Sequence, residues 1–222
     1  MSITQNIIEL KASLPEGVTL IAVSKFHPAK ALLEAYEAGQ RVFGESRAQE
    51  LKAKQQELPS DIEWHFIGTL QRNKVKDIAA YIHTIHSVDS IKLLEEIQKE
   101  ASKNNRNIHI LLEIHIAEEE TKHGLNPIEC KELLSKLPFD EYPNIRFAGL
   151  MCMATDTDDT EQVRKEFRLL HSLFVEIKEG WFKNNTDFKQ LSMGMSHDYP
   201  IAIEEGSTMV RIGTRIFGER EY

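Results

Sequence analysis

The sequence predicts an α/β protein built as a single (β/α)8 barrel of the TIM type, with one extra helix at the N-terminus. Three observations carry this prediction. Short apolar segments alternate with helix-like segments from about residue 18 onward, which indicates parallel βαβ units. The apolar segments number eight, which favours a closed barrel over an open doubly wound sheet. No Pro/Ser-rich linker divides the 222 residues, so residues 1–222 are expected to form one domain.

The extra helix and the first strand are the first two elements. Ile3, Ile7 and Leu10 recur at helical spacing, and the turn residues 15–17 would end that helix. Residues 18–23 are almost all apolar and predict a buried strand, which ends at Ser24-Lys25.

The same alternation then repeats along the chain. Pro28 and Gly39 are typical start and stop signals of the next helix. The further strands are predicted at residues 41–43, 64–67, 83–88, 108–116, 145–151, 188–191 and 209–212. The helices between and around them are predicted at residues 28–38, 47–57, 73–80, 90–103, 127–137, 160–178 and 201–203.

Composition and charge narrow the class of protein. Charged residues make up 28% and hydrophobic residues 41% of the chain, as in an ordinary soluble globular protein. The net charge of −8 argues against nucleic acid as the main partner, because phosphate backbones attract basic surfaces. Residues 1–14 lack a signal-peptide pattern, and no apolar run spans a membrane. We therefore expect a cytoplasmic protein with no membrane partner, and free thiols at Cys130 and Cys152.

Lys25 is the first candidate functional residue, because functional groups of such barrels lie at the C-terminal ends of the strands. Taken alone, it is most simply an exposed lysine at the rim. The alternative is a partly buried amine at the barrel mouth, where burial lowers the pKa and makes the neutral nucleophile available for a Schiff base.

Two loops near the end of the chain resemble a phosphate site. In these barrels the loops after strands seven and eight commonly bind phosphate. Here they contain Gly194-Met195-Ser196 and Gly213-Thr214. Glycine lets backbone N–H groups approach phosphate oxygens, the hydroxyls can add hydrogen bonds, and a short helix after Ser196 would favour an anion. Helix capping is the plain alternative.

Arg211 lies between apolar residues of the eighth predicted strand, so it needs a partner. One possibility is a structural ion pair with Glu45 or Glu219. The other is a hydrogen bond to the ring nitrogen of pyridoxal 5'-phosphate (PLP), which would leave that nitrogen unprotonated and weaken the ring as an electron sink.

Histidines supply one further candidate and no metal site. His65, on the third strand, is either a structural residue or faces the cofactor ring from the barrel interior. The pair His83 and His86 does not form an HExxH motif and has no evident third ligand, so we predict no metal. No GxGxxG or P-loop motif occurs, which argues against dinucleotide or nucleotide binding.

Several segments together closely resemble the YggS/PROSC family of PLP homeostasis proteins, in order from about residue 20 to the C-terminus. These segments are IAVSK (21–25), FGE (43–45), WHFIG (64–68), QRNK (71–74), KHG (122–124), LSMGMS (191–196) and STMVRIGT (207–214). Where the family usually has Gly-Glu-Asn, this chain has Ser46 in place of the asparagine.

The resemblance implies a barrel similar to the N-terminal domain of alanine racemase. It implies that Lys25 holds PLP as an internal aldimine and that Arg211 faces the pyridine nitrogen. Ser196, Gly213 and Thr214 would hold the phosphate. Gly194, Met195 and His65 complete the predicted cofactor-binding set, and we assign no catalytic residue.

Three functions remain open at this point. The first is a PLP carrier or homeostasis protein without robust turnover, with apo PLP-dependent enzymes as candidate partners. The second is an amino-acid racemase with weak activity. Racemisation needs a second acid/base, a tyrosine that alanine racemase takes from an additional C-terminal domain. We expect no such domain here, and a monomer, because the chain ends soon after the eighth strand. The third is a barrel that binds another phosphorylated ligand.

Overall fold

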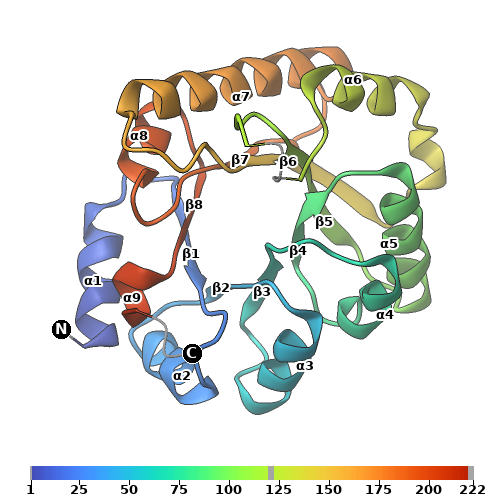
Figure 1. Cartoon of the computed structure of the whole chain (residues 1–222). Helices are drawn as coiled ribbons and strands as arrows, with labels where there is room; N and C mark the ends of the chain where they lie inside the picture. Colours follow the sequence, from blue (N-terminus) through green and yellow to red (C-terminus); the bar gives the residue numbers. More distant parts are fainter. Residues whose placement is uncertain (1, 120–122, 220–222) are drawn as a thin grey trace.

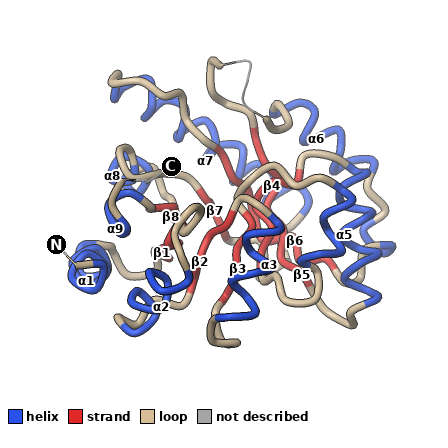
Figure 2. The backbone as a smooth tube through the Cα atoms, turned by 60° about the horizontal axis from the view of Figure 1, so that its bottom comes forward, coloured by secondary structure: helices blue, strands red, loops and turns tan. Residues whose placement is uncertain are grey.

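Eight parallel strands form a closed barrel in the order in which they occur along the chain. The structure is a computed structural model, and it describes residues 2–119 and 123–219. The strands line the centre and the helices form the outer layer (Figures 1 and 2). The predicted barrel with an extra N-terminal helix is therefore confirmed. Lys122, in the segment 122–124, lies outside the described residues.

The strands are short, and each pairs with the next one along the chain. They are β1 (Thr19–Val23), β2 (Val42–Glu45), β3 (Glu63–Phe66), β4 (Thr84–Val88), β5 (Ile108–Ile114), β6 (Ile145–Cys152), β7 (Gln190–Ser192) and β8 (Met209–Ile212). The barrel closes where β1 pairs with β8, with Thr19 opposite Met209 and Ile21 opposite Arg211.

The seventh strand differs from its predicted bounds of 188–191. Phe188 is buried outside the barrel, where its ring stacks on Phe182 at a centroid distance of 4.4 Å. Sheet pairing starts only at Gln190, opposite Gly149 of β6. The apolar residues of segment 188–191 therefore have two roles. Part of this segment belongs to β7, and Phe188 packs on Phe182 before the strand begins.

The helices cover the outside of the barrel. They are α1 (Ile3–Ser13), α2 (Ala29–Glu37), α3 (Ala48–Glu57), α4 (Val75–Ile78), α5 (Ile91–Lys103), α6 (Pro127–Lys136), α7 (Thr160–Trp181), α8 (Tyr199–Glu204) and α9 (Thr214–Phe217), with 3-10 turns η1 (Arg72–Lys74) and η2 (Phe139–Glu141). Neither η2 nor α9 was predicted. The helix predicted at residues 73–80 is the 3-10 turn η1 followed by one turn of α4.

The N-terminal helix α1 packs beside α9 and α2 (Figure 1). Ile7 and Leu10 of α1 are buried, and Asn6 Nδ2 donates a hydrogen bond of 2.9 Å to the Ile216 carbonyl of α9. The extra helix is thus part of the core, and it buttresses the segment that follows β8.

The barrel interior is a separate apolar cluster inside the ring of strands. Its buried members are Ile21, Leu111, Ala148, Met151 and Met209. Because side chains alternate across a strand, residues two positions after an inward-facing residue also face inward. On β8 this places Arg211 on the inward face with Met209, one layer nearer the C-terminal end of the barrel.

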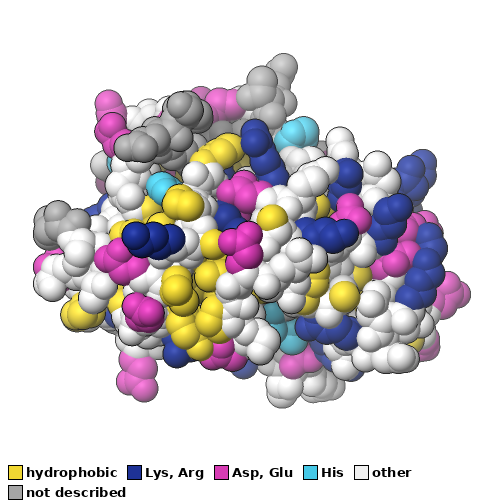
Figure 3. Space-filling view, turned by 90° about the horizontal axis from the view of Figure 1, so that it is seen from below, with side chains coloured by type: hydrophobic (Ala, Val, Ile, Leu, Met, Phe, Trp, Pro, Cys, Tyr) yellow, Lys and Arg dark blue, Asp and Glu magenta, His cyan; other side chains and the backbone are white. Residues whose placement is uncertain are grey.

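The surface carries both signs of charge. On the face in Figure 3, Lys and Arg side chains are interspersed with Asp and Glu. Within the described residues, we find no helix with both the length and the apolar character needed to cross a membrane.

Candidate cofactor site at the barrel mouth

A cavity of about 450 Å³ opens at the C-terminal ends of β1, β6, β7 and β8. Its lining brings together six of the eight residues that the sequence predicted for cofactor binding: Lys25, Met195, Ser196, Arg211, Gly213 and Thr214. A volume of this size is ordinary for a small-molecule site. The cavity also includes residues 153–157 of the loop after β6, which the sequence did not single out.

Lys25 lies in a tight turn that follows β1, and its side chain is half-buried. The turn is closed by a hydrogen bond of 3.1 Å from His27 N to the Ser24 carbonyl. Phe26, directly after Lys25, has φ 69, which is rare for a bulky residue and strains the backbone. The surrounding contacts must therefore hold this turn in place.

Three side chains hold the strained turn. Glu50 Oε1 accepts a hydrogen bond of 2.6 Å from Phe26 N, and the Arg47 guanidinium lies 4.7 Å from the centre of the Phe26 ring. Lys54 Nζ donates to the Ser24 carbonyl at 2.7 Å. All three come from α3 or the residue before it, so this helix fixes the backbone on both sides of Lys25.

A buried ion pair connects the same helix to β2. Lys54 Nζ lies 2.6 Å from Glu45 Oε1, which also accepts a hydrogen bond of 2.7 Å from Ser24 Oγ. Burial raises the pKa of Glu45, and Lys54 opposes that shift by stabilising the carboxylate. The possible pairing of Glu45 with Arg211 is therefore wrong, because Glu45 faces α3 while Arg211 faces the barrel interior.

Arg211 is buried and is held by three hydrogen bonds from its terminal nitrogens. One nitrogen donates to the Ser192 carbonyl at 2.9 Å and to Ser192 Oγ at 2.7 Å. The other donates to the Cys152 carbonyl at 2.7 Å. The partners lie on β6 and β7, and they fix the orientation of the planar guanidinium at the cavity. Arg211 forms no ion pair with Glu219 among the described residues.

The loop after β7 depends on a glycine. Gly194 has φ 94, and a Cβ there would lie 2.6 Å from Ala202 Cβ and 2.9 Å from Tyr199 Cα. Only glycine lets the loop pack this closely on α8. Gly194 does not itself line the cavity, but its carbonyl accepts a hydrogen bond of 2.9 Å from Arg211 N, which connects the two parts of the site.

The other candidate phosphate loop follows β8. Gly213 precedes α9, and Thr214 is the first residue of that helix. A Cβ on Gly213 would lie 3.1 Å from the Val23 carbonyl at the end of β1, so the small residue lets this loop approach the strand that carries Lys25. In the Ser196 loop, Asp198 Oδ1 accepts a hydrogen bond of 2.5 Å from Met195 N.

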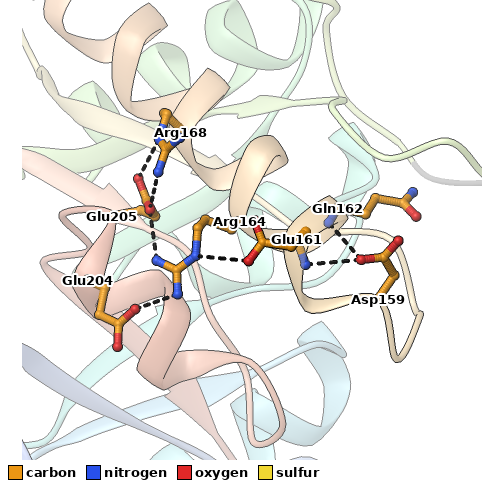
Figure 4. A network of polar contacts seen from close by, with 7 residues as sticks. All are labelled: Asp159, Glu161, Gln162, Arg164, Arg168, Glu204 and Glu205. Carbon is orange, nitrogen blue, oxygen red and sulfur yellow. Dashed lines mark hydrogen bonds and ion pairs between the residues drawn. The ribbon is translucent and has the colours of Figure 1, made fainter.

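A network of ion pairs fixes the far end of α8 to α7 (Figure 4). Arg164 donates to Glu204 at 2.6 Å and to Glu205 at 2.9 Å, and Arg168 donates to Glu205 at 2.9 and 3.1 Å. The arginines offset the unfavourable position of two carboxylates at a helix C-terminus. They hold in place the helix on which Gly194 packs.

His65 lies in the barrel interior as predicted, but it does not line the cavity. Its Nδ1 is 2.8 Å from His86 Nε2, and His86 Nδ1 is 3.1 Å from Ser192 Oγ, which accepts the hydrogen bond from Arg211. His65 is therefore one layer below the cavity, at the start of a hydrogen-bonded chain that ends at Arg211. Burial lowers the pKa of His65 to about 3, so the ring is neutral.

The sequence analysis considered only the pair His83 and His86 as metal ligands, and His86 is not part of the group of ligand-type side chains that the structure brings together around His83. Glu63, His65 and His83 come together near the N-terminal ends of β3 and β4. Glu63 and His65 come close to His83 because β3 pairs with β4, with His65 opposite Thr84.

Ser192, His86 and Glu113 are buried polar residues to which the sequence analysis assigned no role at the cofactor site. Glu113 on β5 has a pKa raised to about 7, because it is buried and near Asp89, although Arg211 opposes the shift. The available signal was period-two spacing: Ser192 and Glu113 are polar residues within apolar strands. Ser46, by contrast, is absent from the cavity lining and packs against Gly68.

Comparison with known proteins decides the family. Residues 1–221 match the family model described as alanine racemase, N-terminal domain. The pyridoxal phosphate homeostasis protein of Aquifex aeolicus (strain VF5) is 45% identical over 204 residues, 91% of this chain and 87% of that protein. The protein of that name in Escherichia coli (strain K12) is 38% identical, over 94% of this chain and 88% of its own length. This chain belongs to the pyridoxal phosphate homeostasis protein family.

Solved structures agree with this family. PipY of Synechococcus elongatus PCC7942, in a structure without PLP, has a TM-score of 0.91 and 36% identity, and the match covers 98% of this chain and all of PipY. PipY with PLP bound has a TM-score of 0.88. Alanine racemase of Clostridium difficile 630 is 16% identical with a TM-score of 0.73, which shows a shared fold over 57% of that enzyme. The predicted resemblance to the homeostasis family is confirmed.

Proposed function

We propose that this protein binds PLP at the barrel mouth and serves PLP homeostasis without robust catalytic turnover. The observation that carries the proposal is that the Lys25 amine and the Arg211 guanidinium line one cavity together with the Ser196 and Gly213-Thr214 loops. The family relatives named above, and PipY with PLP bound, support the same ligand.

The chemistry of the lining fits each part of PLP. The Lys25 amine can bond to the aldehyde carbon, with the aldehyde oxygen leaving as water. The Ser196 and Thr214 hydroxyls and the backbone N–H groups beside Gly213 can donate to the phosphate. Arg211 can donate to the ring nitrogen. Gly194, through its close packing on α8, and Met195 complete the loop on the phosphate side.

The choice of arginine beside the ring nitrogen favours storage over turnover. PLP acts in enzymes as an electron sink, and it does so best when its ring nitrogen is protonated. Arg211 has no acidic proton to give at neutral pH and donates only a hydrogen bond. Its hydrogen bonds to Ser192 and Cys152 keep it oriented for that contact.

The decisive experiment is to locate bound PLP. The purified protein should show a visible absorption band with PLP, and borohydride reduction followed by mass spectrometry should place a pyridoxyl group on Lys25. Lys25→Ala should lose the trapped adduct, whereas the exposed Lys30→Ala should keep it. A colourless protein that gains no band with added PLP would instead support a different phosphorylated ligand.

A weak racemase is the alternative that the alanine racemase fold favours. We expect no sustained interconversion of D- and L-alanine by the PLP-loaded protein. Sustained activity that Lys25→Ala abolishes would contradict the homeostasis proposal.

The homeostasis proposal includes delivery of PLP to apo-enzymes from a monomeric carrier. Mixing the loaded protein with an apo PLP-dependent enzyme should restore that enzyme's activity faster than the release of PLP into a trapping buffer allows. Equal rates would mean that the protein only buffers free PLP. Light scattering after size exclusion gives the oligomeric state.

A further inference from the structure

A cluster of metal-ligating side chains lies at the barrel end opposite the cofactor cavity. Glu63 and His65 are two residues apart on β3, so they leave the strand on the same face, and His83 directly precedes β4. One carboxylate oxygen and two ring nitrogens from these residues all lie within 4.8 Å of one another. Glu63 Oε2 is 3.8 Å from His83 Nε2.

Each histidine already has its other ring nitrogen in a hydrogen bond. His65 Nδ1 is 2.8 Å from His86 Nε2, and His83 Nδ1 is 2.8 Å from Thr84 Oγ1. This leaves Nε2 of both rings for the cluster. Metal-binding histidines typically hold their second nitrogen in such a contact, which fixes the tautomer and the orientation of the ring.

His65 Nε2 is the second observation that points to a ligand. The side chain is almost completely buried, and this nitrogen has no hydrogen-bond partner among residues 2–119 and 123–219. A buried polar atom without a hydrogen-bond partner destabilises the folded state and is rare in folded proteins. A cation between the three residues would occupy that nitrogen, and the half-exposed Glu63 would give it an entry path and a compensating charge.

We propose that Glu63, His65 and His83 bind a divalent first-row transition metal ion such as zinc, with water in the fourth position. Two imidazoles and one carboxylate suit zinc, whereas calcium and magnesium prefer oxygen ligands throughout. The site would tie the start of β3 to the start of β4. None of the three residues lines the cofactor cavity, and the proposal does not rest on the proposed function.

Binding requires a small closure of the cluster. Zinc–ligand bonds of about 2.0–2.2 Å in a tetrahedral site imply ligand separations of roughly 3.3 Å, so the atoms must approach by about 1.5 Å at most. The His65 and His83 rings are nearly parallel, at 6°, so the His83 ring must also tilt toward the ion. The side chains of His83 and Glu63 are 40% and 52% exposed, which gives both of them room to move.

The test is a zinc titration of the full chain, without an affinity tag, against a competing chromophoric chelator. We expect one zinc per chain and a rise in the thermal midpoint, because the ion binds the folded state. Glu63→Gln and His83→Gln should each weaken binding at least about tenfold. Thr84→Val keeps the shape of the side chain but removes the contact to His83 Nδ1, and should also cost roughly tenfold.

Two controls separate this site from other zinc binding. His171→Gln changes a histidine on α7 outside the cluster and should leave the affinity unchanged. His197→Gln changes a histidine that lines the cofactor cavity and should also retain zinc, which excludes capture by that histidine. The proposal is overturned if no stoichiometric zinc binds, or if the double variant Glu63→Gln/His83→Gln binds zinc as tightly as the unaltered chain.

Discussion

At the scale of single residues, the site depends on buried polar groups whose partners are fixed. Arg211 is oriented by Ser192 and the Cys152 carbonyl, and the turn at Lys25 is held by Lys54 and Glu50. Removal of one partner lowers the free energy of unfolding, because the remaining polar group stays buried without a hydrogen bond. Substitutions at these residues should therefore change stability as well as PLP binding.

Glu113→Gln tests a buried carboxyl whose pKa is raised to about 7. The pKa of Glu113 in the folded chain is about 7, above its usual 4.5, so folding favours the protonated form. Its contribution to stability is fully present below pH 4.5 and is lost as pH rises through 7. The variant should therefore be more stable than the unaltered chain at pH 8, by up to roughly 3 kcal/mol, and no more stable at pH 4.5. Urea unfolding at both pH values measures the difference, and an equal difference at both would contradict the assignment.

Lys54→Met tests the ion pair beneath the Lys25 turn. The substitution leaves the Glu45 carboxylate buried without its cation, so the free energy of unfolding should fall by about 3–5 kcal/mol. PLP affinity should fall too, because the Ser24 carbonyl keeps the hydrogen bond from His27 N but loses the one from Lys54. Lys52→Met, an exposed position on the same helix, is the control and should change neither quantity appreciably. Urea unfolding and PLP titration give the two readouts.

At the scale of elements, the cavity is formed where three short segments meet after their strands. Helix α3 holds the turn after β1. Helix α7 holds α8 and thereby the loop before it. Helix α1 holds α9, which starts the segment after β8. The helices thus do more than cover the sheet. They determine the positions of the loops that carry the candidate binding residues.

Gly194→Ala tests the contact between the β7 loop and α8. A Cβ at this position would meet Ala202 Cβ at 2.6 Å on a backbone with positive φ. We expect a loss of about 1–3 kcal/mol in stability and weaker PLP binding, because the loop must shift. Gly180→Ala, near the end of α7 with nothing within 4 Å, should be neutral or slightly stabilising. Thermal unfolding of the two variants side by side makes the comparison, and equal midpoints would count against a required glycine.

At the scale of the whole molecule, the two ends of the barrel have different characters. The C-terminal end holds the cofactor cavity, and the N-terminal end holds the Glu63, His65 and His83 cluster. The chain His65–His86–Ser192–Arg211 runs between them through the interior.

The N-terminal helix α1 should count as part of the barrel core. Ile7 is fully buried, so Ile7→Ala should cost about 2–5 kcal/mol of unfolding free energy. Ile8 is 51% exposed on the same helix, and Ile8→Ala should stay within about 0.5 kcal/mol of the unaltered chain. Urea titration distinguishes the two. A small effect at Ile7 would mean that α1 is dispensable.

We also propose that residues 1–222 unfold as one domain. Because α1 packs on α9 and β1 pairs with β8, both ends of the chain contribute to one closed structure. Transitions followed by far-UV and near-UV circular dichroism should therefore coincide in the absence of PLP. Two separated transitions would contradict a single cooperative unit.

Much of the fold could be read from the sequence because its signals are local. Apolar strands, helix spacing and turn residues each depend on a few neighbouring positions, and they predicted the eight strands and the extra helix. Strand ends and glycine loops made Lys25, Arg211, Ser196 and Thr214 candidates, and the resemblance to the homeostasis family favoured them over the plainer alternatives. The bounds of β7 were missed because Phe188 is apolar for a different reason, namely stacking on Phe182.

Only the tertiary structure decided the partners of these residues. Glu45 pairs with Lys54 and not with Arg211, and His65 lies below the cavity where it contacts His86. The sequence alone determined that Lys25 follows a buried strand and that Arg211 is enclosed by apolar neighbours. Closure of the barrel determined what these side chains contact, because it places β3, β4, β7 and β8 around one interior. The distances between these strands along the sequence do not indicate which side chains meet there.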